Sequence, residues 1–160
     1  MTSRQYVEKL FDANFQRTEY ILNNYLHYKA LEKHVENNVS HAFFDLVASQ
    51  MEGKEEFDNQ DKTLINKAGP YLLKTIDEAI DSIKRLPLEI SNSVYPAIYY
   101  YYLFEVSKGT TKKVAELMLV NDQISVTEDE ICQLLEKGIR MLSALLFDER
   151  YINAIKEGNK

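Results

Sequence analysis

Residues that interrupt helices are rare in this chain. Its 160 residues include five glycines and three prolines, and the first 52 residues contain neither. Inside a helix, glycine costs about 1 kcal/mol and proline about 3 kcal/mol relative to alanine, so their scarcity favours long helices. The length suits one domain of ordinary size. We therefore predict one all-α domain of residues 1–160, a helical bundle of about six or seven helices with one or two long N-terminal helices.

The segment 1–52 is predicted to be the long helical part. Its apolar residues recur at intervals of four, which is a helical spacing: Val7, Phe11, Phe15, Leu22 and Leu26. Thr18 fills the one step that lacks an apolar residue, and the pattern resumes at Leu31. One helix of this length would extend for about 75 Å and would need a partner, which points to dimerisation. The alternative is two helices with a break near Asn23–Asn24, because asparagine tolerates a left-handed backbone. We favour the break.

Residues 53–70 are predicted to form an acidic connecting loop with room for a short helix, and residues 71–160 to hold the remaining helices. The acidic side chains from Glu52 to Asp61 lack the regular ligand spacing and the invariant glycine of an EF-hand loop, so we expect them to be solvated. Gly69–Pro70 is a strong stop-and-start signal, and the helix that follows is expected to end at Pro87.

Further helix signals follow Pro87. Ser91 or Ser93 is expected to cap the next helix, with Pro96 tolerated in its first turn. That helix contains the tyrosine run Tyr99–Tyr102 and is predicted to be central, despite a composition that also suits a strand. A shorter helix is expected over residues 111–120.

The final helix has the clearest pattern of the chain. Thr127 and Glu130 form a capping box at its start, and five apolar residues follow on one stripe: Ile131, Leu135, Ile139, Leu142 and Leu146. Gly138 lies on the same stripe, where a glycine is explained by a close helix crossing, either within the bundle or across a dimer interface. Cys132, at the edge of the stripe, is expected to be a buried, inert thiol. As the only cysteine it excludes an intramolecular disulfide and fits a reducing compartment.

Charge and hydropathy limit the classes of partner that we expect for this chain. The net charge is −6 and the sequence pI about 5.1, and such an acidic surface repels phosphate and anionic lipid at long range. The longest apolar run, residues 94–104, is far shorter than the roughly 20 residues that cross a bilayer. The N-terminus lacks the pattern of a secretory signal. We therefore expect a cytoplasmic protein with no nucleic-acid or membrane partner.

All three histidines, His27, His34 and His41, are spaced seven residues apart. On a helix this spacing corresponds to a rise of about 10.5 Å, whereas zinc binds histidine nitrogens about 2.0–2.1 Å away, so neighbouring members cannot share one ion unaided. Asp45 follows His41 by four residues and can orient its ring. In our first interpretation, this row of histidines covers the rim of the hydrophobic core. Its alternatives are a divalent transition-metal site of His34, His41 and Asp45 with carboxylates from elsewhere, a pH-sensitive interface, or acid–base catalysis.

The four consecutive tyrosines 99–102 point in four directions on an α-helix, 100° apart. They therefore indicate a helix surrounded on most sides, with hydroxyl groups reaching polar partners at the bundle's ends. The alternative is a small-molecule pocket between helices, since aromatic lining with few polar anchors suits such a site. Its lining would be Tyr95, Tyr99, Tyr101 and Tyr102.

The sequence contains no phosphate-binding glycine loop, nucleophile elbow, paired Cys-x-x-Cys or His-Glu-x-x-His motif. The leading hypothesis is accordingly a non-enzymatic protein that acts through protein–protein association as a homodimer, without a cofactor. Its interface is predicted to lie on the N-terminal helices and on the glycine-containing stripe of the last helix: Leu31, Val35, Val39, Phe43 and Gly138. The alternatives are the metal-binding bundle and the small-molecule binder described above.

Overall fold

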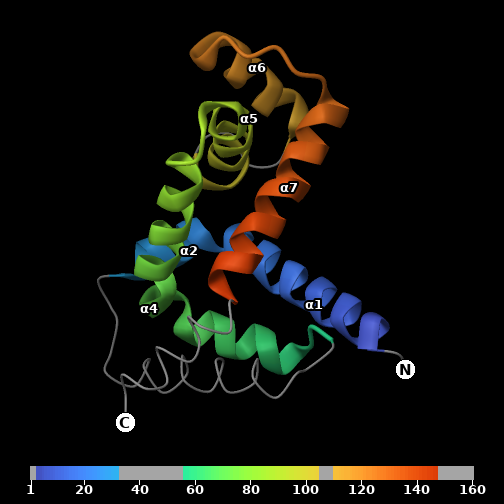
Figure 1. Ribbon diagram of the computed structural model, residues 1–160. Coiled ribbons are helices and arrows are strands. Elements are labelled where there is room, and N and C mark those ends of the chain that lie inside the picture. Colours follow the sequence, from blue (N-terminus) through green and yellow to red (C-terminus); the bar gives the residue numbers. More distant parts are fainter. Residues whose placement is uncertain (1–2, 33–55, 105–109, 148–160) are drawn as a thin grey trace. The chain divides into compact units, whose positions relative to one another are not determined.

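The computed structural model describes residues 3–32, 56–104 and 110–147, and over these ranges it consists of helices without a strand. The predicted all-α class is therefore confirmed. The helices labelled in Figure 1 are α1 (Ser3–Asn23), α2 (Tyr25–Leu31), α4 (Asn59–Lys84), α5 (Leu88–Ile98), α6 (Thr111–Asp122) and α7 (Glu128–Leu146). The π-helix η2 (Tyr99–Leu103) directly follows α5.

The chain divides into two compact units. Unit 1 comprises residues 1–76 and 143–160, and unit 2 comprises residues 77–142. Helices α4 and α7 contribute residues to both units. The assignment of a single domain stays a prediction.

The predicted break at the asparagine pair is confirmed, but its backbone differs from the expectation. Asn24 separates α1 from α2 with φ −107° and ψ 6°, which is the bridge region and not the left-handed region. Its backbone N–H donates to the carbonyls of Tyr20 and Ile21, both at 3.2 Å. Its side-chain Nδ2 also donates to the Tyr20 carbonyl at 2.8 Å. Asparagine thus ends α1 by bonding the last free carbonyl groups itself.

Helix α4 overturns the prediction of a connecting loop over residues 59–70. It begins at Asn59 and passes through Gly69–Pro70 without ending. Its start is capped by Asp58, whose Oδ1 accepts from the backbone N–H of Asp61 at 2.9 Å. Gly69 is needed for packing: a Cβ at this position would fall directly on the ring of Tyr28. The glycine therefore marks a close contact inside a helix rather than a helix end.

The expectation that Asp61 is solvated is also wrong. Its side chain is completely buried and lies 2.9 Å from Nη2 of Arg17 in α1, which is equally buried. The same Nη2 donates to the Glu56 carbonyl at 3.2 Å, and Nη1 donates to Asn14 Oδ1 at 2.9 Å. Arg17 therefore joins α1 to the first turn of α4 and to the residues just before it.

Helix starts in unit 2 follow the prediction in part. Helix α5 begins directly after Pro87, so Ser91 and Ser93 lie within it and do not cap it, and Pro96 occupies its last turn instead of its first. Pro87 is the N-cap residue, with φ −49° and ψ 145°, and makes no side-chain cap hydrogen bond. In α6 the Thr110 side chain accepts from the N–H of Lys113.

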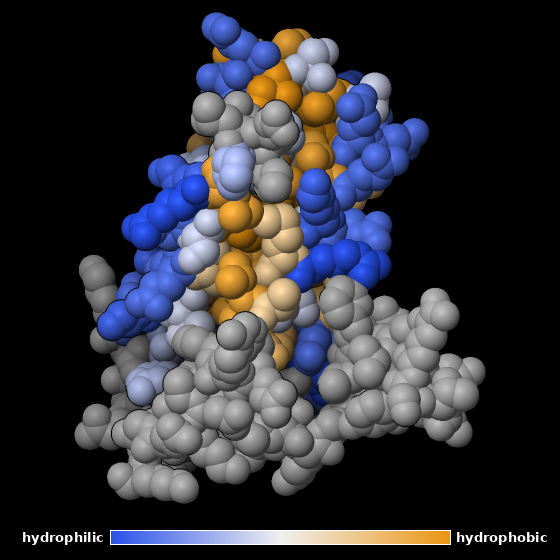
Figure 2. All heavy atoms as spheres, viewed as in Figure 1, coloured by the Kyte–Doolittle hydropathy of each residue, from blue (hydrophilic) through white to orange (hydrophobic). Residues whose placement is uncertain are grey.

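The capping box of α7 is confirmed in both directions. The N–H of Glu130 donates to Thr127 Oγ1 at 3.1 Å, and the N–H of Thr127 donates to Glu130 Oε1 at 3.2 Å. The predicted stripe is buried at Ile131, Leu135, Ile139 and Leu142. On the face that Figure 2 shows, hydrophobic residues form a band with hydrophilic residues on either side.

Cys132 is exposed, so the expectation of a buried thiol is wrong. It follows Ile131, which is completely buried, and one residue corresponds to a rotation of about 100° around the helix axis. This rotation takes the cysteine out of the stripe.

Candidate functional site

The most distinctive local structure in the described ranges is the π-helix η2, which carries the predicted tyrosine run. It begins three residues after Pro96, which has no N–H to donate and whose ring crowds the carbonyl four residues earlier. At the junction the N–H of Tyr99 points to two carbonyls, those of Tyr95 and Pro96. Short π-helical turns inside helices occur frequently at functional sites. This segment is therefore the candidate site from which we start.

Four aromatic side chains of this segment touch one another, and we call them the aromatic cluster: Tyr95, Tyr99, Tyr100 and Phe104. The rings of Tyr95 and Tyr99 are stacked, with centroids 6.0 Å apart and an interplanar angle of 26°. Phe104 meets Tyr99 at 5.9 Å and meets Tyr100 edge-on at 5.8 Å. Tyr100 is buried, whereas the other three are half-buried. The cluster thus presents partly exposed aromatic surface, a composition enriched in binding interfaces.

Tyr100 connects the cluster to the last turn of α6. The side chains of Asn121 and Asp122, in that turn, act on the pKa of its hydroxyl in opposite directions. The pKa of Tyr100 is raised, first by burial and then by the Asp122 hydrogen bond, because a donor that ionises would lose this bond. The predicted polar partner for a hydroxyl of the run is therefore present at this position.

A cationic side chain lies at the other edge of the cluster. Lys84 Nζ is 5.5 Å from the centre of the Tyr95 ring, a cation–π distance. The pKa of Tyr95 is raised by burial and by the neighbouring charges of Tyr99 and Asp81. Asp81 is itself paired with Arg85 at 2.7 Å.

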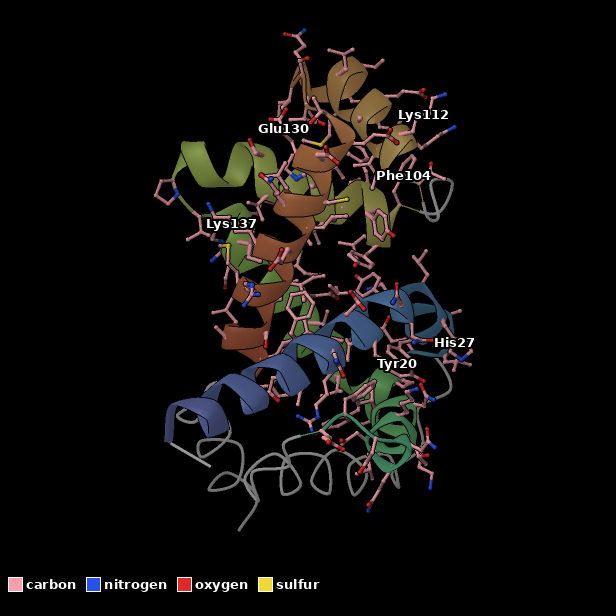
Figure 3. All side chains as sticks on the ribbon, turned by 90° about the vertical axis from the view of Figure 1, so that its right-hand side faces the viewer. Tyr20, His27, Phe104, Lys112, Glu130 and Lys137 are labelled. Atoms are coloured by element: carbon pink, nitrogen blue, oxygen red, sulfur yellow. The ribbon has the colours of Figure 1, made fainter. Side chains whose placement is uncertain are left out.

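Helix α6 exposes two consecutive large apolar residues beside the cluster, which we call the α6 apolar end: Leu119 and Val120. Their exposed fractions are 54% and 75%. Val114 and Met118, on the opposite side of the helix, are completely buried. Figure 3 shows Lys112 projecting outward from the first turn of the same helix, with Phe104 on the neighbouring segment. The exposed side of α6 therefore combines a basic start with an apolar end.

The predicted ligand-pocket residues are brought together in pairs. Tyr95 and Tyr99 stack on each other, and Tyr101 meets Tyr102 edge-on with centroids 4.6 Å apart. Tyr102 is buried and Tyr101 is half-buried. The small-molecule pocket itself stays a prediction.

The histidine row lies mostly outside the described residues. His34, His41 and Asp45 all belong to residues 33–55, which the structure does not describe. His27 is exposed, and Figure 3 shows it projecting outward from α2. Within the described ranges no three His, Cys, Asp or Glu side chains are placed to hold one metal ion. The metal site stays a prediction.

Two of the predicted interface residues can be placed. Leu31, at the end of α2, is 37% exposed, while Val35, Val39 and Phe43 lie outside the described residues. Gly138 is buried, and a Cβ there would lie 2.6 Å from Ile98 Cγ1. Of the two explanations offered for this glycine, the structure shows the crossing of two helices within one chain.

Sequence analysis missed the groups that surround the tyrosine run. Asp122, Asn121 and Lys84 come from other helices and carry no spacing relation to the run. One signal was present: Pro96 lies three residues before Tyr99, and a proline inside a helical pattern disturbs the bonding of the following turn.

Comparisons with family models, with curated proteins and with solved structures gave no match to this chain. Among the described residues, no helix is both long enough and apolar enough to cross a membrane.

Proposed function

We propose that this protein acts by binding another polypeptide, in the first place a second copy of itself, and not by catalysing a reaction. The observation that supports this most is the α6 apolar end, where Leu119 and Val120 are exposed side by side. Aromatic surface from Tyr99 and Phe104 lies on the preceding segment, and aromatic side chains are enriched in interfaces.

The size of this surface indicates weak association. Complete burial of a leucine or valine side chain contributes about 1.5–3 kcal/mol, so four such side chains in a symmetric dimer contribute at most about 6–12 kcal/mol. The loss of translational and rotational freedom costs about 4–15 kcal/mol. The two terms are of similar size, so we expect a dimer that forms only at high protein concentration.

Sedimentation velocity from low micromolar to about 0.5 mM protein tests the proposal. The parent chain should show a concentration-dependent shift toward dimer, and Val120→Glu should abolish the shift. Gln133→Glu introduces the same charge at an exposed position of α7 and should leave the shift unchanged. Leu31→Glu tests the interface predicted on the N-terminal helices. A parent chain that stays monomeric throughout would refute self-association.

A further inference from the structure

Helix α2 has too few residues to be stable by itself. It contains the seven residues Tyr25–Leu31, and isolated helices shorter than about 12–15 residues are marginal in water. The backbone bonds of α1 do not continue into it, since the N–H groups of Leu26 and His27, both in the described part of the chain, donate to no carbonyl of α1. The bond that starts α2 runs instead from the N–H of Tyr28 to the Asn24 carbonyl at 2.9 Å. The helix must therefore be stabilised by its packing on the rest of unit 1.

Tyr28 is the side chain through which α2 is buried. It is completely withdrawn from solvent, and the other residues of α2 are half-buried or exposed. Helix α1, by contrast, buries several side chains between residues 13 and 22: Ala13, Arg17, Thr18, Ile21 and Leu22. Burial must offset the entropy that is lost when a backbone becomes ordered. Helix α2 therefore depends on this one residue, whereas α1 is held by several.

Two positions on α4 receive Tyr28. A Cβ at Gly69 would fall directly on the Tyr28 ring, so the glycine leaves the space that the ring occupies. About one turn earlier on α4, Asn66 Oδ1 accepts from the Tyr28 hydroxyl at 3.2 Å. A substitution at either α4 position therefore acts on the docking of α2 without altering any residue of α2.

We propose that docking of Tyr28 on Gly69 and Asn66 is what folds α2, and that α2 opens by local unfolding while α1 and α4 stay folded. Such openings cost least where few side chains are buried. His27 and Leu31 are exposed on α2, so the surface that they form exists only while Tyr28 is docked. A partner that binds this surface stabilises the docked form, and one that fills the space over Gly69 releases α2, because each binds one form better than the other. This coupling does not require the proposed self-association.

Hydrogen exchange of the backbone amides in the full chain measures this opening. In the parent protein, residues 28–32 should exchange at least about tenfold faster than residues 17–22, at rates that low urea leaves unchanged, since a local opening exposes little surface. Gly69→Ala should raise the rates at residues 28–32 by about a further tenfold, because its methyl group overlaps the Tyr28 ring. Ile76→Val is the control. It removes one carbon atom from a buried side chain of the same helix and should leave these rates unchanged, because the packing of Ile76 persists when α2 opens.

Two hydroxyl variants keep the test decisive if Gly69→Ala fails to fold. Tyr20 in α1 and Tyr28 in α2 both donate to Asn66 Oδ1, so Tyr20→Phe and Tyr28→Phe remove matched hydroxyl groups. Tyr28→Phe should speed exchange at residues 28–32 about fivefold, and Tyr20→Phe should not, because the Tyr20 bond persists when α2 opens. The proposal is overturned if residues 28–32 of the parent exchange as slowly as residues 17–22, or if Gly69→Ala leaves their rates unchanged. It is also overturned if either control speeds their exchange as much as its partner variant does.

Discussion

Arg17 and Asp61 form an ion pair whose two side chains are completely withdrawn from solvent, with Nη2 and Oδ2 2.9 Å apart. Two further bonds hold the guanidinium, from Nη1 to Asn14 and from Nη2 to the Glu56 carbonyl. Removing such charges from water costs several kcal/mol per ion, which only a close partner and additional hydrogen bonds offset. Each member of this pair therefore depends on the other.

We expect Asp61→Ala to destabilise unit 1 by about 3–5 kcal/mol, because it leaves the Arg17 charge buried without its carboxylate. Urea unfolding followed by circular dichroism measures this. Arg17→Met combined with Asp61→Leu should recover most of the loss, since it removes both charges and fills the volume. The exposed pair Asp81–Arg85 is the control: Asp81→Ala should change stability by less than about 1 kcal/mol. Equal losses at both pairs would contradict the argument.

The sequence could not have shown this pair, and the reason is physical. Asp61 stands in an acidic stretch, and an acid among acids is normally solvated. Its partner is 44 residues away and is brought close only by packing of α1 on α4. By contrast, the break at Asn24 and the capping box of Thr127 and Glu130 were predictable, because their hydrogen bonds connect residues within four positions.

Two helical glycines should differ in their tolerance of a methyl group. At Gly138 the new Cβ would lie 2.6 Å from Ile98 Cγ1 and 3.1 Å from Val94 Cγ1. Such overpacking costs about 1–3 kcal/mol, and the better helix propensity of alanine returns up to about 1 kcal/mol. At Gly69 the Cβ would meet the Tyr28 ring, which is completely buried and has no flexible end to move.

We therefore expect Gly69→Ala to lower the unfolding free energy more than Gly138→Ala, as measured by urea titration. Ile98→Val in the Gly138→Ala background removes the Cδ1 atom that lies 2.7 Å from the new methyl group. This second change should restore part of the loss. If Ile98→Val instead lowers stability in the Gly138→Ala background as much as it does in the parent chain, then the contact between residues 98 and 138 does not cause the loss.

Alkaline pH should destabilise the protein through its buried tyrosines. Burial raises the pKa of Tyr28, and the neighbouring Tyr20 raises it further. With a folded pKa above the unfolded value near 10, the unfolded chain loses its proton first as the pH rises. Stability is then complete below about pH 10 and falls above it, by up to about 1.4 kcal/mol per pH unit for each such tyrosine.

Tyr28→Phe separates this effect from simple loss of packing. The Tyr28 hydroxyl donates to Asn66 Oδ1 at 3.2 Å, so its removal lowers stability by about 1 kcal/mol below about pH 10, where the tyrosine is protonated in both states. Only the slope of stability against pH between about 10 and 11.5 is diagnostic, and it should become shallower in the variant. An unchanged slope would mean that Tyr28 does not ionise on unfolding in this range.

The tyrosine run shows where sequence patterns stop being sufficient. Its helical nature and the burial of part of its rings were predictable from the surrounding pattern. The π register was not, because the spacing of apolar residues does not distinguish a π-helix from an α-helix, and only Pro96, three residues before Tyr99, signals a disturbed turn. On an α-helix the side chains of Tyr99 and Phe104 would point in different directions, whereas in the structure their rings are in contact.

Gln123 has φ 58° and ψ 33°, and in the described ranges it is the non-glycine residue with positive φ. For an L-residue this backbone costs about 1–2 kcal/mol. Its N–H and that of Ile124 both donate to the Met118 carbonyl, so the backbone closes α6 without using the glutamine side chain. A glycine at position 123 would adopt this backbone without a steric penalty, but ordering its more flexible backbone would cost about 0.5–1 kcal/mol of stability.

Gln123→Gly should therefore stabilise the protein by about 0.5–1 kcal/mol, seen as a higher urea midpoint with an unchanged slope. Gln133→Gly is the same substitution at an exposed position inside α7 and should destabilise by about 1 kcal/mol. The two variants have equal composition and differ only in backbone conformation at the substituted residue. Opposite signs would show that the left-handed turn after Asp122 is strained, and equal losses would show that it is not.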